Sequence, residues 1–196
     1  EEMNLKKGGF LLQTAANSVV GRVMIQLGKI FGFETINIVR NQESLKDLKE
    51  SYGIKNVYVF DGTNKDDLYF SIKKEYKEIK FVIDAVSGDL GKLCWKLLSP
   101  DGVFYSYGAL SNVHGINVNI VSDLCRDNKT MKGWSIQGTW LRQKNNSTKL
   151  KMINEIWDLF RSNELILPPL GKNFEMEQFQ EAILESIKPQ KEGKIT

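Results

Sequence analysis

The stretch that decides the fold is Gln13-Thr14-Ala15-Ala16-Asn17-Ser18-Val19-Val20-Gly21. It joins a short apolar run, residues 9–12, to a segment with helical apolar periodicity that ends near residue 31. This order predicts a strand, a tight turn and a helix, which together open a βαβ unit.

Small residues occupy the turn at the spacing of a G-x-G-x-x-G loop: Ala16, Ser18 and Gly21. Small side chains there allow a tight turn, let the backbone approach a pyrophosphate and let the helix pack closely on its strand. The N–H groups and the positive dipole end of the following helix would then face the phosphates. Because Gly21 is the only glycine of the three, a dinucleotide site needs support from the residues that follow.

That support comes from Arg40, which ends a β-branched strand predicted over residues 35–39. In a Rossmann unit the residue about twenty positions after the loop recognises the adenosine ribose. A carboxylate there accepts from the ribose 2′-OH of NAD, whereas a guanidinium offers forked donors to a 2′-phosphate. The sequence therefore favours NADPH, and the competing interpretation is a solvated arginine at a strand end.

Helices and strands alternate along most of the remaining chain. Strands are predicted over residues 56–60, 80–84 and 103–107, with a sixth near 132–136, and helices over 43–52, 65–74 and 87–98. This alternation predicts an α/β fold, a Rossmann-type doubly wound parallel sheet with helices on both faces and the strand order 3-2-1-4-5-6. Asp84 and Asp89 are not convincing general acids, since one ends a strand and the other begins a helix.

The end of the chain departs from this pattern. Residues 147–161 predict an amphipathic helix that should cover the sheet with an apolar face of Leu150, Ile153, Ile156, Trp157 and Phe160. A further helix is predicted over residues 177–187, and neither it nor the final residues 193–196 extend the βαβ pattern.

The loop 15–21, the residues 25–27 and the strand with its arginine, 35–40, resemble the cofactor domain of the zinc-independent medium-chain dehydrogenases and reductases. The likeness is narrower to the mitochondrial 2-enoyl thioester reductases. It continues through Tyr107-Gly108-Ala109-Leu110 and Lys132-Gly133-Trp134-Ser135-Ile136, so it covers nearly the whole chain.

The resemblance implies a set of cofactor contacts and no catalytic or metal-binding residue in this sequence. The implied contacts are Asn17, Ser18, Val19, Val20, Gly21, Arg40, Tyr107, Gly108, Ala109, Leu110, Trp134, Ser135, Ile136 and Lys194. Several have a plainer interpretation: residues 107–110 as a glycine turn at a strand end, Trp134 as a core residue, and Lys194 as a solvated lysine. Residues 138–141 compete with residues 133–136 for the same match, although the spacing favours the latter.

The resemblance also implies a domain division. Residues 1–162 correspond to the NADPH-binding Rossmann domain, and residues 163–196 to a short C-terminal remnant of a catalytic domain whose larger part precedes the cofactor domain in the family. The family's catalytic tyrosine lies in that preceding part. We therefore expect residues 1–196 alone to bind cofactor without turnover.

The implied activity is NADPH-dependent reduction of trans-2-enoyl thioesters, carried by coenzyme A or acyl-carrier protein, in fatty acid synthesis. By the same resemblance the protein would be a homodimer of the mitochondrial matrix, with the cytoplasm as the alternative. Two other functions remain open: an NADPH:quinone or enone reductase of the same superfamily, and a non-catalytic nucleotide-binding protein.

Composition narrows the function classes. The 196 residues carry a formal charge of +3 with a pI near 8.7, and the lysines are spread along the chain, which argues against nucleic acid as a partner. No apolar run approaches the roughly 20 residues that a membrane span needs. Cys94 and Cys125 lie far apart, with His114 between them, so they are predicted to be buried thiols rather than a disulfide or a metal site.

Overall fold

A computed structural model describes residues 5–111, 113, 115–143, 145–167 and 171–188. Its centre is a six-stranded, all-parallel sheet in the order β3-β2-β1-β4-β5-β6, as predicted. The strands are β1 (Phe10–Gln13), β2 (Glu34–Val39), β3 (Val57–Val59), β4 (Phe81–Asp84), β5 (Val103–Ser106) and β6 (Thr130–Gly133). The α/β doubly wound fold is confirmed.

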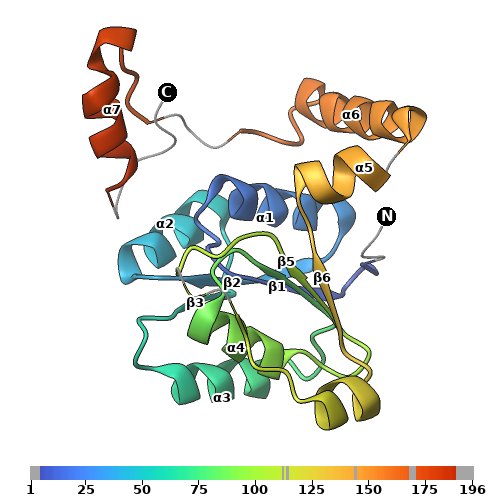
Figure 1. The fold of residues 1–196 in the computed structure, drawn as a ribbon. Helices are drawn as coiled ribbons and strands as arrows, with labels where there is room; N and C mark the ends of the chain where they lie inside the picture. The colour runs from blue at the N-terminus through green and yellow to red at the C-terminus, as the bar shows by residue number, and fades with distance from the viewer. Residues whose placement is uncertain (1–4, 112, 114, 144, 168–170, 189–196) are drawn as a thin grey trace.

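Helices cover both faces of this sheet (Figure 1). The bounds of the helices are α1 (Val19–Phe31), α2 (Gln42–Tyr52), α3 (Lys65–Glu75) and α4 (Gly88–Leu97). The first two lie on one face and the last two on the other, because the chain reverses direction across the sheet between β3 and β4. All four carboxyl-end loops that follow β1, β2, β4 and β5 therefore meet at one edge.

Local sequence signals set the helix ends close to where they were predicted. Asn41 caps α2 by accepting a hydrogen bond from Ser44 N, and Gly53 ends the same helix in the left-handed region at φ 62°. Gly32 ends α1 in the same way at φ 77°. Most boundaries move by one or two residues, which is the usual uncertainty of strand and helix ends. The sixth strand, predicted near residues 132–136, lies earlier, at Thr130–Gly133, so residues 134–136 follow it.

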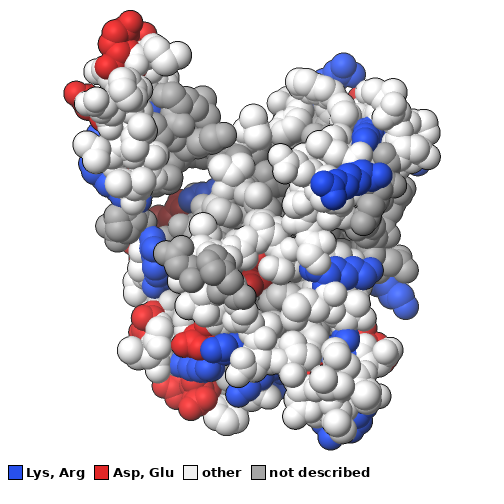
Figure 2. Space-filling view, viewed as in Figure 1, with Lys and Arg blue, Asp and Glu red and all other residues white. Residues whose placement is uncertain are grey.

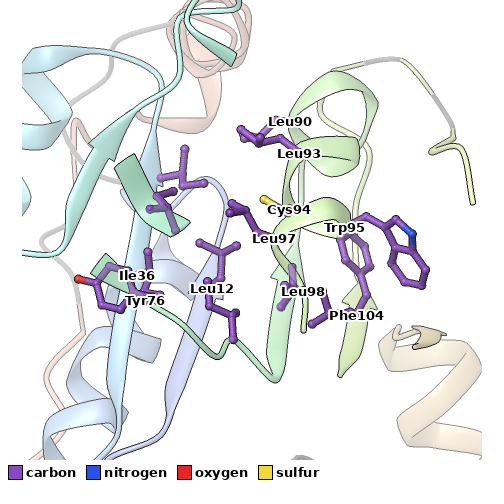
Figure 3. Packing of buried hydrophobic residues seen from close by; sticks show 14 of the residues in the cluster. Leu12, Ile36, Tyr76, Leu90, Leu93, Cys94, Trp95, Leu97, Leu98 and Phe104 are labelled. Carbon is purple, nitrogen blue, oxygen red and sulfur yellow. The ribbon is translucent and has the colours of Figure 1, made fainter. Parts of the chain in front are cut away.

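The largest apolar core lies between the sheet and the α3–α4 layer (Figure 3). Trp95 and Leu97 of α4 are at most 2% exposed, and the ring of Trp95 meets that of Phe104 edge to face at 5.9 Å between centroids. Cys94 lies in this core, as predicted, and burial raises the pKa of its thiol well above the usual range, so it stays protonated. Cys125 is exposed, and the prediction that it is buried was wrong because the turn from residue 120 to 126 lies outside the sheet.

Smaller cores lie beneath α1 and α2 on the other face. Ile25 of α1 packs with Val39 and Leu48, while Met24 and Leu27 pack against a second group that contains Leu11 and Tyr105. These contacts hold α1 against the sheet, and its N-terminus follows the carboxyl end of β1, where the candidate site lies.

The chain leaves the sheet after β6. It forms a wide helical turn, Ile136–Trp140, then the short α5 (Leu141–Gln143), α6 (Asn146–Arg161), a 3-10 turn at Met176–Gln178 and α7 (Phe179–Ser186). Helices α6 and α7 stand apart from the sheet in Figure 1. Of the described helices, none is long and apolar enough to cross a membrane.

The prediction that the helix over residues 147–161 covers the sheet was wrong. The helix forms, but it has no buried residue, and Leu150 and Trp157 on its apolar face are 60% and 56% exposed. The physical reason is that α1 to α4 already cover both faces of the sheet. The amphipathic pattern therefore predicts the helix correctly, but no face of the sheet is left for it to pack on.

Candidate functional site

The first turn of α1 builds the centre of the candidate site. Ser18 is the N-cap, and its Oγ accepts a hydrogen bond from Gly21 N at 3.2 Å. Helix geometry leaves the N–H groups of Val19 and Val20 without partners in the helix, and the two residues are 41% and 46% exposed. Ala15, in the loop before them, adopts a left-handed φ of 50°. Two N–H groups and a positive helix end thus face solvent at the carboxyl edge of the sheet, which suits a phosphate.

Gly21 permits the close approach on which this turn depends. A β-carbon at this position would lie 2.4 Å from the carbonyl oxygen of Ala16 and 2.6 Å from its Cα. The sequence predicts that a larger side chain here would push the helix off its strand, whereas in the structure the clash is with the backbone of the loop itself. Either way, the position requires glycine.

The loop is tied to β4 through two residues that the sequence argument did not assign to the site. Thr14 Oγ1 donates to Asp84 Oδ1 at 2.7 Å and accepts from Ala85 N at 2.9 Å. Asp84 also accepts from the N–H groups of Val86 and Ser87, and it is 1% exposed. With its lone pairs engaged by these donors, Asp84 anchors two loops and is not placed as a general acid.

A second buried network ties the loop to β2. Gln13 Nε2 donates to Gly21 O at 3.1 Å and to Asn37 Oδ1 at 2.6 Å, while Asn37 Nδ2 donates to Thr35 and to Asn56 O. Both amide side chains are 0% exposed. The signal that could have found them is an amide at the same register position in two adjacent strands, since Gln13 pairs with Asn37.

Arg40 follows the last residue of β2 and is exposed, beside the N-terminus of α2. Asn17 of the loop reaches the same helix, donating from Nδ2 to Ser44 Oγ at 3.1 Å. Arg22 of α1 forms an ion pair with Asp47 of α2 and donates to Asn17 O at 3.0 Å. The loop and the arginine at the end of β2 therefore form one continuous surface.

Residues 107–110 follow β5 at the same edge. Tyr107 N donates to Asp84 O and Leu110 N donates to Ala85 O. These two hydrogen bonds attach the turn to the end of β4. A β-carbon at Gly108 would lie 2.9 Å from Ala85 O, which explains the glycine. The turn borders the phosphate loop, and Leu110 is 70% exposed there.

Residues 134–136 follow β6, the edge strand. Trp134 N donates to Ser106 O at 2.8 Å, and the Trp134 side chain is 41% exposed, which rules out the core interpretation. Ser135 caps the next helical turn by accepting from Gly138 N, and Ile136 is 59% exposed. Lys194 lies outside the described residues, as does His114.

The arrangement fits a phosphate-bearing dinucleotide better than a metal or a charged macromolecule. The loop offers N–H donors and, at Gly21, a close backbone approach that a β-carbon would block. Arg40 adds a cation at the carboxyl end of β2. Among the described residues, no group of three or more His, Cys, Asp or Glu side chains is placed to hold a metal ion. Figure 2 shows Lys and Arg side chains scattered over the visible face among acidic ones.

Comparison with known proteins shows the family to which the chain belongs. Residues 19–158 match the family model described as zinc-binding dehydrogenase, and the chain belongs to this family. The match includes α1, the sheet from β2 to β6 and most of α6.

A relative among the curated proteins is the mitochondrial enoyl-[acyl-carrier-protein] reductase of Caenorhabditis elegans. It is 27% identical over 176 residues, which cover 87% of this chain and 48% of the relative. The chain thus spans about half the length of the curated relatives it matches.

Two solved structures share the fold. A protein assigned as an NADPH:quinone reductase, from Bacillus thuringiensis, aligns with a TM-score of 0.83 at 22% identity, covering 100% of this chain and 57% of that one. The mitochondrial 2-enoyl thioester reductase heterodimer Etr1p/Etr2p from Candida tropicalis aligns with a TM-score of 0.80 at 22% identity, covering 98% and 55%. At 22% identity, these two alignments show that the fold is shared, and they show nothing further.

Proposed function

We propose that this chain is the NADPH-binding part of a reductase that acts on 2-enoyl thioesters. The observation that carries the proposal is the position of the loop before α1 and of Arg40 at the same edge of the sheet, where Asn17 of the loop donates to Ser44 in the helix that follows Arg40. The curated relative is named as an enoyl-[acyl-carrier-protein] reductase, and Etr1p has been solved with NADP and crotonyl-CoA. Those names supply the substrate class, which the residues of this chain do not choose by themselves.

In this proposal each part of the site has a separate task. The N–H groups of Val19 and Val20 hold the pyrophosphate, and Arg40 holds the 2′-phosphate. The turn 107–110 and residues 134–136 border the nicotinamide end, where exposed apolar side chains exclude water from the reacting face. The bound cofactor supplies the hydride that reduces the carbon–carbon double bond, and the chain supplies binding and orientation.

The domain division stays part of the proposal. We assign residues 1–162 to the cofactor domain and residues 163–196 to a segment that completes a catalytic domain in a longer protein. The exposure of Phe179, Ile183 and Leu184 on α7 supports this assignment, since apolar faces of this kind are normally covered. The proton donor, a homodimeric assembly, zinc-independent chemistry and a place in the mitochondrial matrix follow from the same resemblance and stay predictions.

Titration of NADPH and NADH against the Arg40→Ala variant tests the proposal. Loss of a charge-assisted, bidentate contact should weaken NADPH binding by roughly 1.5–3 kcal/mol and leave NADH binding unchanged. The matched control is Arg126→Ala, which removes an equal charge from an exposed side chain before β6, at the opposite edge of the sheet. Equal losses for both dinucleotides, or a loss in the control, would contradict the assignment.

A quinone or enone substrate is the second candidate, because the Bacillus thuringiensis protein has the same fold and that description. Both candidates require NADPH, so the cofactor titration does not separate them. Turnover of a protein that includes the catalytic domain, measured on a short series of enoyl-CoA esters and on quinones, does. If the chain binds neither dinucleotide, a nucleotide-free scaffold with the same fold replaces both candidates.

A further inference from the structure

Two buried side-chain polar atoms lack a hydrogen-bond partner among the described residues: Gln13 Oε1 and the Tyr107 hydroxyl oxygen. Both belong to residues that border the first turn of α1. Gln13 donates its amide N–H to Gly21 O, and Tyr107 lies beside Ser18. A buried polar atom without a partner destabilises a fold by about 1–3 kcal/mol. The first turn of α1 is thus the place where this fold retains polar groups at a cost in stability.

The Tyr107 side chain reaches the helix from a distant strand. It follows β5, which β4 separates from β1 in the sheet, whereas Ser18 lies in the loop after β1. Like Met24 and Leu27 of α1, Tyr107 packs against the buried apolar group that contains Leu11 and Tyr105. Packing therefore explains the ring of Tyr107 but not its hydroxyl, because phenylalanine would fill the same space.

The Tyr107 hydroxyl is held in its protonated form. Burial raises the pKa of this group, the nearby Ser18 hydroxyl lowers it in part, and the negative charge of Asp84 raises it again. The net pKa therefore lies above 10.0, the usual value for tyrosine. At neutral pH the group is therefore a hydrogen-bond donor. In the structure the two hydroxyls are close, but they do not meet the geometry of a hydrogen bond.

Ser18 Oγ has the capacity to join this donor to a ligand. It already accepts from Gly21 N at 3.2 Å, and a hydroxyl oxygen has a second lone pair and one proton to donate. If the Ser18 proton points to a phosphate oxygen, the second lone pair faces the core, where the Tyr107 hydroxyl lies. Each bond in such a chain polarises and strengthens the next.

We propose that Tyr107 is a positioning residue for the dinucleotide pyrophosphate: its hydroxyl donates to Ser18 Oγ while Ser18 donates to a phosphate oxygen. This inference rests on the proposed function and adds to it a residue that acts from beneath the phosphate loop. Because NADH and NADPH share the pyrophosphate, Tyr107 contributes to the affinity of both, in contrast to Arg40.

The Tyr107→Phe variant of the 196-residue chain tests this role. Removal of one hydrogen bond in a chain that ends on a phosphate should weaken NADPH and NADH binding alike, by about 3- to 10-fold. The thermal midpoint should stay the same or rise, because an unpartnered buried hydroxyl is removed. Tyr105→Phe is the matched control, since Tyr105 lies two residues earlier in the same apolar group, and it should leave both affinities unchanged.

A double-mutant cycle with Ser18→Ala shows whether Tyr107 acts through Ser18. We expect the Ser18→Ala, Tyr107→Phe double variant to bind no more weakly than Ser18→Ala alone, which a purely structural role would not produce. Unchanged affinities in Tyr107→Phe, or additive losses in the cycle, overturn the inference and leave the proposed function intact. If the unmodified chain binds neither NADPH nor NADH, the proposed function fails, and this inference fails with it.

Discussion

Helices α4 and α6 have similar local sequence features and opposite surroundings. Both are amphipathic, and a serine or asparagine precedes each of them. In α4, seven of the ten residues are buried, whereas in α6 none of the sixteen residues is buried. Among the described residues, a similar contrast holds between the sheet region, residues 5–133, and the C-terminal region, residues 134–188, in which only Leu165 is buried.

The difference shows that an apolar stripe specifies a helix but not what the helix packs against. Helix α4 forms next to a sheet whose exposed face needs covering, and Trp95, Cys94 and Leu97 enter its core. Helix α6 follows the edge strand of a sheet that is already covered on both faces. Folding stability of the described chain should therefore reside almost entirely in the sheet region.

The largest expected effect comes from a pair of tryptophan substitutions, one in each region. Trp95→Ala should lower the free energy of unfolding by about 3–5 kcal/mol, because it leaves a large cavity and removes the indole N–H that donates to the Asp123 carboxylate. Trp157→Ala, at a side chain 56% exposed, should change it by less than about 0.5 kcal/mol. Urea unfolding followed by far-UV circular dichroism measures both. Similar losses from the two variants would show that α6 belongs to the same cooperative core.

Glycine substitutions give a second, smaller contrast. A β-carbon at Gly21 meets loop backbone at 2.4 Å, whereas one at Gly138 meets the Ser135 side-chain oxygen at 2.8 Å, and a side chain moves more easily than backbone. We expect Gly21→Ala to lower the free energy of unfolding by about 1–3 kcal/mol. The same variant should weaken NADPH binding.

The Gly138→Ala substitution is the matched control, and its effect on unfolding should stay within about 0.5 kcal/mol. Thermal unfolding measures the stability of both variants, and titration with NADPH measures their affinity for the cofactor. Normal NADPH affinity in a folded Gly21→Ala protein would show that the phosphates bind away from this loop.

The smallest effect is a pH dependence within the sheet region, at the Asp123 carboxyl beside Trp95 of α4. Partial burial raises the pKa of the Asp123 carboxyl, but hydrogen bonds from Trp95 Nε1 and Asn119 N and the charge of Lys129 outweigh it, so the net pKa lies below 3.8. A lowered folded-state pKa gives a stabilisation that is complete above the unfolded value and is lost as the pH falls through the folded value.

Asp123→Asn should therefore destabilise the chain at pH 7, by about 1 kcal/mol or less, and its effect should shrink as the pH falls below 3.8. The comparison of unfolding free energies of the two proteins across this pH range checks the sign. A difference that grows toward acid pH would contradict it.

Strand order and helix ends could be read from the sequence because their signals are local. Alternation of apolar strands with capped helices fixed the parallel topology, and asparagine and glycine at the ends of α2 fixed its bounds. The exposure of Cys125 and of the α6 face could not be read, since exposure depends on which other segment arrives at that surface. Ile120, Val121 and Leu124 in the turn before β6 are apolar and are nevertheless 68%, 73% and 40% exposed.

The candidate site was predicted in part for the same reason. Ser18, Gly21 and Arg40 sit at fixed distances along one βαβ unit, so spacing alone placed them together. The anchoring roles of Thr14, Asp84 and Gln13 were not predicted, because Thr14 and Asp84 lie 70 residues apart along the chain and Gln13 lies 24 residues from Asn37. The role of the Tyr107 hydroxyl likewise depends on an approach from β5 to the end of β1.

The sequence by itself determined the elements, their order and the tight turn between β1 and α1, because each depends on interactions within a few residues or on the handedness of βαβ crossovers. Only the tertiary structure decided which polar side chains anchor that loop and which apolar faces stay uncovered. Both are set by contacts between segments far apart along the chain, and the periodicity of either segment alone contains no information about the other.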